Sequence, residues 1–138
     1  MRLVLDTNVI VSAAFWGGVA RQVLETAQCD HTLCFTEETL AELERVLRYS
    51  KFAERLEKLD FTVTEFIERL TERAIVLPAP TRTIDVVKAD PDDNKFLSCA
   101  AAARAEAIVS GDTHLLELKT FKGIGIVSPH IFLSKKKE

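Results

Sequence analysis

The stretch Leu3-Val4-Leu5-Asp6-Thr7-Asn8, near the start of the chain, decides the fold. Its three apolar residues form a short continuous run that ends abruptly in polar residues. Such a run is typical of a central strand that is buried on both faces of a sheet. Further short apolar runs predict four more strands, at Thr32–Phe35, Ile75–Leu77, Ala107–Ser110 and Ile124–Val127.

Helical patterns fill most of the segments between these runs, at about residues 20–27, 37–47, 52–59, 64–74, 94–105 and 112–116. Thr36 is expected to cap the second helix, because its hydroxyl can accept a backbone N–H at the helix start. Strands that alternate with helices indicate a largely parallel sheet with helices on both faces. We therefore predict a three-layer α/β/α fold with a mainly parallel central sheet of about five strands, in a single domain spanning residues 1–138.

The composition, with 47% apolar and 28% charged residues, is that of a soluble globular protein. No apolar run approaches the roughly 20 residues of a membrane span, and the first residues lack a signal peptide, so we expect a cytoplasmic protein without a membrane segment. The three cysteines have neither disulfide nor metal-ligand spacing and are expected to be buried thiols. The net charge of −3 argues against indiscriminate nucleic-acid binding but allows a local basic rim.

Carboxylates follow two of the predicted strands. Asp6 comes directly after the first strand, and Asp112 follows a later strand after one glycine. Ligand sites of open α/β sheets form beyond the carboxyl ends of the strands, so both acids are expected at one sheet edge. Asp93 lies three and four residues before Phe96 and Leu97, which extends the inward stripe of its helix over that edge. Asp93 and Asp112 can equally be helix N-caps, whereas capping is less natural for Asp6, which ends a strand.

Three segments together resemble the successive motifs of the PIN domain family: Asp6-Thr7-Asn8-Val9-Ile10-Val11-Ser12-Ala13-Ala14, Ala89-Asp90-Pro91-Asp92-Asp93-Asn94-Lys95-Phe96-Leu97 and Ile108-Val109-Ser110-Gly111-Asp112. The resemblance extends over essentially the whole chain and is greatest to VapC-type toxins of bacterial and archaeal toxin–antitoxin systems. It implies a metal-dependent endoribonuclease that hydrolyses RNA phosphodiester bonds, forms a homodimer and has a cognate antitoxin as partner.

The resemblance also implies the site residues. Asp6, Asp93 and Asp112 match active-site acids, and Glu42 matches the family's second acid. Asn8 matches a polar position that helps to organise the first acid. The residues alone favour another interpretation of Glu42, because on a helical wheel it only flanks the buried stripe and resembles a solvated surface acid.

A cluster of acids needs a cation, because each ionised pair about 5 Å apart costs on the order of 3 kcal/mol at an effective dielectric near 20. An all-oxygen cluster without His or Cys suits Mg²⁺ or Mn²⁺ and not zinc. The implied chemistry is attack of a metal-activated water on phosphorus, leaving a 5′-phosphate and a 3′-hydroxyl. We assign Asp6 and Asp93 as direct ligands, and Glu42 and Asp112 as ligands through water or as groups that orient the nucleophile.

An acidic site repels phosphate, so RNA must be held by other residues. The basic residues Arg48, Lys51 and Arg55 are candidates for contacts to the RNA backbone. A solvated helix face is an equally good interpretation of these three residues. Phe15 and Trp16 can stack on unpaired bases, although such aromatic residues more often pack against the core or a partner subunit.

Two other enzyme and signalling classes place an aspartate after the first strand of such a sheet. In haloacid-dehalogenase-like phosphatases the nucleophile lies in a DxD motif, but the third position here is Asn8. Receiver-like signalling domains carry Lys-Pro after the last strand, where this chain has Ser128-Pro129. A catalytically idle module that binds RNA or protein is the remaining alternative.

Overall fold

A six-stranded sheet forms the centre of the computed structural model, which describes residues 1–80, 86–87 and 91–136. Its strands, in chain order, are β1 (Arg2–Leu5), β2 (Thr32–Thr36), β3 (Ile75–Leu77), β4 (Ala107–Val109), β5 (Thr120–Phe121) and β6 (Ile124–Val127). The spatial order is β3-β2-β1-β4-β6-β5, and every pair is parallel except β5 with β6. The five predicted strands are therefore present, and the sixth, β5, is a two-residue strand too short to give an apolar run.

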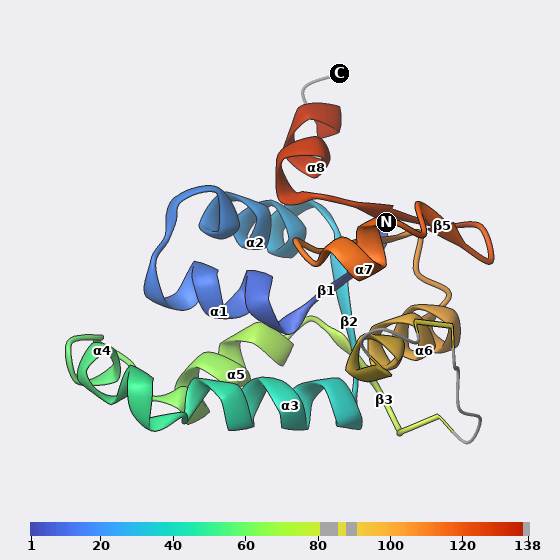
Figure 1. The fold of residues 1–138 in the computed structure, drawn as a ribbon. Coiled ribbons are helices and arrows are strands. Elements are labelled where there is room, and N and C mark those ends of the chain that lie inside the picture. Colours follow the sequence, from blue (N-terminus) through green and yellow to red (C-terminus); the bar gives the residue numbers. More distant parts are fainter. Residues whose placement is uncertain (81–85, 88–90, 137–138) are drawn as a thin grey trace.

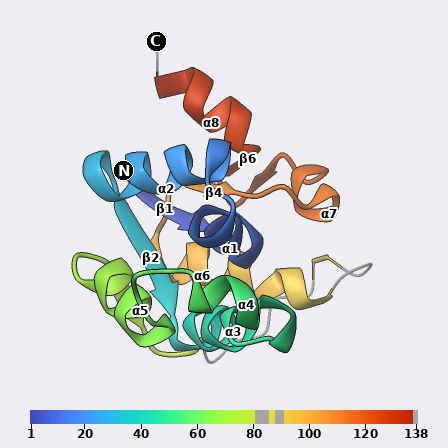
Figure 2. The same cartoon turned by 90° about the vertical axis from the view of Figure 1, so that its left-hand side faces the viewer.

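Helices cover both faces of this sheet, which confirms the predicted three-layer fold (Figures 1 and 2). They are α1 (Thr7–Phe15), α2 (Gly18–Asp30), α3 (Glu37–Leu47), α4 (Ala53–Glu57), α5 (Val63–Thr71), α6 (Asn94–Ala103), α7 (Thr113–Leu116) and α8 (Pro129–Lys136), with short 3₁₀ turns η1 (Ser50–Phe52) and η2 (Pro91–Asp93). Figure 1 shows α6 on one side of β1 and β2, with α1, α2, α3 and α5 on the other. None of the described helices is long and apolar enough to cross a membrane.

Strand β1 shows how the sequence builds both layers. Successive side chains of a strand point to opposite faces, so Leu3 and Leu5 belong to the core under α1, α2 and α3, whereas Val4 belongs to the core under α6. All three side chains are buried. Complete burial of one such side chain stabilises the fold by about 1.5–3 kcal/mol, so the opening apolar run anchors both helical layers.

The order of the strands makes the ends of β1 and β4 the switch point of the sheet. The chain proceeds outward from β1 to β2 and β3, and it then returns to place β4 on the other side of β1. The connections after β1 and β4 therefore leave the sheet in opposite directions, and ligand sites of open α/β sheets form at such a point. Asp6 and Asp112 follow these two strands.

Two helices begin where the helical pattern of the sequence did not place them. Helix α1 begins immediately after β1 at Thr7, in a stretch that is apolar all round and lacks a helical stripe. Helix α8 follows the last strand, where Pro129 occupies the first position and the Ser128 hydroxyl accepts the Ile131 N–H at 3.2 Å. Its Phe132 is buried in the core layer that includes α2.

The three cysteines differ in burial. Cys34 and Cys99 are buried thiols as expected, but Cys29 is exposed, which corrects the prediction for that residue. It lies near the end of α2, whose buried residues are Val23, Leu24 and Ala27. Asp90, in the second resembling motif, lies outside the described residues.

Candidate active site

Asp6 is the one residue between β1 and α1. Its Oδ1 accepts the Val9 N–H at 2.9 Å, so Asp6 is the N-cap of α1. The expectation that a cap is less natural here is therefore wrong. The reason is that no loop separates β1 from α1, so the residue that follows the strand is also the cap. The cap fixes the orientation of a carboxylate whose residue is only 4% exposed.

Ser110 connects the ends of β1 and β4. It is fully buried, and its hydroxyl donates to Asp6 Oδ2 while accepting the Asp112 N–H at 2.9 Å. One side chain thus satisfies the second oxygen of Asp6 and fixes the backbone of Asp112. From the sequence, Ser110 was predicted only as the end of a strand. Its role in the site could have been inferred from its position, because it is a polar residue that ends an apolar run close to an acid.

Asp112 caps α7, as its helix-cap interpretation allowed. Its Oδ1 accepts the His114 N–H at 2.7 Å and the Leu115 N–H at 3.4 Å. The same oxygen lies 3.5 Å from Nδ1 of His114. Capping and a place in the site are therefore not alternatives for Asp112.

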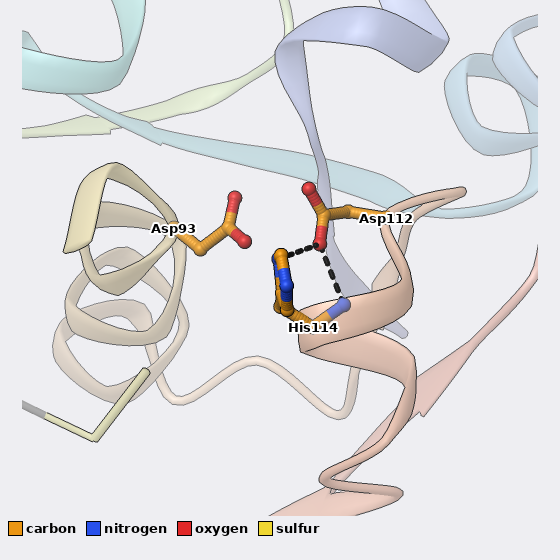
Figure 3. Close-up of side chains that lie close together, drawn as sticks. All are labelled: Asp93, Asp112 and His114. Carbon is orange, nitrogen blue, oxygen red and sulfur yellow. Dashed lines mark hydrogen bonds and ion pairs between the residues drawn. The ribbon is translucent and has the colours of Figure 1, made fainter. Parts of the chain in front are cut away.

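Asp93 completes a group of three potential ligands with Asp112 and His114. One ligand atom from each of these side chains lies within 4.8 Å of the other two. Figure 3 shows the three side chains converging, with Asp93 before α6 and the other two at α7. Asp93 is buried and occupies the N-cap position of α6, as one interpretation of the sequence had it, but its side chain makes no cap hydrogen bond. His114 was not predicted from the sequence, because only acids were sought there, although it lies two residues after Asp112.

Glu42 lies between α1 and α6 and not on a solvated face. One of its carboxylate oxygens accepts the Thr7 hydroxyl, and the other accepts Lys95 Nζ at 2.9 Å. Its side chain is only 14% exposed, so the surface interpretation from the residues alone is wrong. Helix α3 starts at the cap predicted for Thr36, whose hydroxyl accepts the Thr39 N–H at 3.2 Å. Glu42 thereby reaches the residue that follows Asp6.

Burial dominates the electrostatics of Asp6. Loss of solvent raises the pKa of this carboxyl, the hydrogen bonds from Ser110 and the Val9 N–H lower it, and the charge of Asp112 raises it again. The net effect is a pKa above the ordinary value. Folding therefore places Asp6 where its negative charge is costly unless a cation lies nearby.

This raised pKa predicts how the stability of the metal-free protein depends on pH. Folded Asp6 holds its proton more tightly than unfolded Asp6, whose pKa is about 3.9. The free energy of unfolding should therefore fall as the pH rises from the unfolded pKa through the higher folded pKa, by at most about 1.4 kcal/mol per pH unit. Asp6→Asn keeps the cap, and its free energy of unfolding should not show this decrease. Urea denaturation in chelator across pH 4–8 measures the free energy of unfolding of both proteins, and parallel curves would contradict the prediction.

Asn8 lies in the first turn of α1, two residues after Asp6, and it is exposed. The three predicted basic residues lie on other elements. Arg48 pairs with Glu44 at 3.2 Å, and Arg55 lies 4.4 Å from the ring centroid of Trp16. Lys51 lies over the ring of Phe52 at 5.1 Å. Arg48 is the C-cap of α3, Lys51 lies in η1 and Arg55 lies in α4, so all three belong to the segment that follows α3. Figure 1 shows α4 beyond the end of α3, away from the sheet.

Fold and site together define an α/β protein with converging carboxylates at the switch point of a parallel sheet. The sequence model of the PIN domain matches residues 2–114, and the chain belongs to this family. It is also similar to a chain in the crystal structure of VapBC2 from Rickettsia felis bound to a DNA fragment from their promoter. The TM-score is 0.61, with 17% identity, over 93% of this chain and 98% of that chain. This similarity concerns the fold alone. A search of curated protein sequences found no match.

Proposed function

We propose that this PIN domain is a metal-dependent endoribonuclease that hydrolyses RNA phosphodiester bonds and is the toxin component of a toxin–antitoxin system. The observation that carries the proposal is the convergence of Asp93 and Asp112, next to Asp6, at the switch point of the sheet. Family membership supports the nuclease class, and the similarity to a chain of VapBC2 supports a toxin paired with an antitoxin. The homodimer implied by the family resemblance is part of the same proposal.

The donor set fits a divalent cation. Four carboxylates lie at this edge of the sheet, and Lys95 forms an ion pair with one of them, Glu42. The remaining like charges repel one another, and a divalent cation offsets that repulsion. Asp93 and Asp112 present oxygen atoms close enough to share one ion. We therefore assign these two as the residues that hold it, with Asp112 in the direct role that was predicted for Asp6 from the sequence. Mg²⁺ and Mn²⁺ are the ions that carboxylate ligands favour.

The other residues have supporting roles in this proposal. A bound divalent cation supplies an acidic water and charge stabilisation for phosphodiester hydrolysis. Asp6, whose carboxylate is fixed in place by Ser110 and the Val9 N–H, would contribute a further negative charge to hold the ion. Glu42 orients the attacking water from the side of α3, and Lys95 holds its carboxylate in place.

The substrate class can be tested against its rivals with one protein preparation. Single-stranded and structured RNA should be cleaved with Mg²⁺ or Mn²⁺ and left intact in excess chelator. A generic phosphomonoester should not be hydrolysed, and acyl phosphate should not label the protein. Turnover of the phosphomonoester would favour the phosphatase alternative, and labelling by acyl phosphate would favour a receiver. A protein inert in every arm would be an idle binding module.

We further propose that Arg48, Lys51 and Arg55 hold the RNA backbone. All three are exposed, and Arg55 stacks over Trp16, which is itself 54% exposed. Helix α1 spans nine residues from the acids to this end, or about 14 Å. About four nucleotides of a stacked strand cover that length, so one RNA can reach both places.

Charge reversal at these three positions should weaken RNA binding and flatten its salt dependence. Each lost phosphate contact to a single strand removes about 0.7 from the slope of log K against log salt, so three reversals should remove about 2. Binding to an Asp93→Asn background separates affinity from cleavage. Arg73→Glu is the matched control, because Arg73 lines a pocket with His31 and Leu33 at the amino end of β2. An unchanged slope would assign the RNA to another face.

A further inference from the structure

The sequence predicted a cluster of oxygen ligands only, but the structure adds a nitrogen donor. His114 belongs to the same group as Asp93 and Asp112, with one ligand atom from each within 4.8 Å of the others. Its backbone is fixed relative to Asp112, because the His114 N–H and the Leu115 N–H both donate to Asp112 Oδ1, and its Nδ1 lies 3.5 Å from the same oxygen. The imidazole and the carboxylate therefore start from one rigid turn at the beginning of α7.

The three side chains differ in how they meet solvent. Asp93 is 7% exposed, whereas the side chains of Asp112 and His114 are 23% and 43% exposed. The group is thus buried at Asp93 and partly exposed at the two residues of α7 and its cap, and Figure 3 shows how the three side chains face one another. An ion can enter from the open side and lose only part of its water shell, which suits a site with two carboxylates and one imidazole.

The donor set determines which ion is preferred. Mg²⁺ is a hard ion that binds oxygen and gives up water reluctantly. First-row transition metals accept imidazole nitrogen readily, and their affinity for a mixed site rises from Mn²⁺ toward Cu²⁺. An imidazole ligand, unlike a further carboxylate, also adds no negative charge that attracts Mg²⁺. A set of two oxygens and one nitrogen thus favours a transition-metal ion.

We propose that His114 is a metal ligand and that it makes this site prefer a first-row transition-metal ion to Mg²⁺. The inference rests on the proposed function only in taking the ion to be the one used there. It differs from the all-oxygen site for Mg²⁺ or Mn²⁺ that the acids predicted, because one ligand comes from a residue outside the set of acids.

Manganese binding tests this proposal without any assay of RNA cleavage. The electron paramagnetic resonance signal of free Mn²⁺ gives its Kd, and competition by Mg²⁺ gives the second Kd. We expect Mn²⁺ to bind at least about tenfold more tightly than Mg²⁺. Spin-echo modulation of bound Mn²⁺ should show a directly coordinated nitrogen. His114→Ala should remove that nitrogen signal and weaken Mn²⁺ binding about tenfold, while Mg²⁺ binding changes less than about threefold.

Two further variants complete the test. His130→Ala is the matched control, because His130 is exposed on α8, and it should bind both ions like the parent. His114→Gln offers an oxygen in place of nitrogen and should keep Mg²⁺ binding while losing the nitrogen signal. A parent without that signal, or equal losses for both ions in His114→Ala, would overturn the proposal.

The outcomes also separate this proposal from the proposed function. Binding of Mn²⁺ through His114 by a protein that leaves RNA intact would support the metal site and contradict the ribonuclease. Cleavage of RNA by a protein whose ion preference does not depend on His114 would support the ribonuclease and contradict the proposed role of His114.

Discussion

Asp93→Asn is expected to slow RNA cleavage by about a thousandfold or more while the protein remains folded. Asparagine has nearly the shape of aspartate but lacks the charge that holds a cation beside Asp112. Loss of several kcal/mol of charge stabilisation in the transition state corresponds to this factor. The side chain of Asp93 does not cap α6, so the helix does not depend on its carboxylate.

Asp92→Asn is the matched control for this prediction, because Asp92 is the adjacent carboxylate in η2 and is exposed. Cleavage of a fluorescent RNA gives the rates, and circular dichroism reports the fold. Thermal melts add a second readout, since a ligand that binds only the folded state raises the melting temperature. Mn²⁺ or Mg²⁺ should stabilise the parent and Asp92→Asn, and stabilise Asp93→Asn much less. Equal rates, or equal gains with metal, would place Asp93 outside the site.

Ser110→Ala is expected to lower both stability and activity. The substitution removes the donor to Asp6 Oδ2 and the acceptor for the Asp112 N–H. A buried polar group that loses its partner costs about 1–3 kcal/mol, and Ser110 is fully buried. Because Ser110 positions both acids, cleavage should fall about 10- to 100-fold, the effect typical of residues that orient metal ligands.

Chemical denaturation and cleavage rates under conditions where both proteins are fully folded measure these two losses. Ser134→Ala removes a hydroxyl from an exposed position on α8 and should change neither. A Ser110→Ala protein that is less stable but equally active per folded molecule would show that the hydroxyl supports only the core.

The strand order explains why two site residues were predictable and others were not. Asp6 and Asp112 each follow an apolar run, and the rule for parallel sheets places such residues at one edge. Their direct proximity depends on the pairing of β1 with β4, which no local pattern specifies. The link through Ser110 follows from that pairing and was invisible for the same reason.

The environment of Glu42 depends on contacts between distant helices. The helical wheel places it beside the buried stripe of α3, and only the approach of Lys95 from α6 and Thr7 from α1 encloses it. Helix α8 was missed because its amphipathic stripe is weak and its packing partner, α2, lies about a hundred residues earlier. Tertiary packing, and not local preference, decides such elements.

The position of β1 between β2 and β4 has a consequence for the protein's synthesis. Asp6 is synthesised before Ser110, which fixes its carboxylate and lies 104 residues later in the sequence. Chains grow at about 5–20 residues per second, so at least several seconds pass between the synthesis of β1 and that of β4. The acids cannot assemble before residue 112 has been added. If the finished protein cleaves RNA as proposed, a nascent chain that has not reached residue 112 lacks the assembled site and cannot cleave the messenger RNA from which it is being translated.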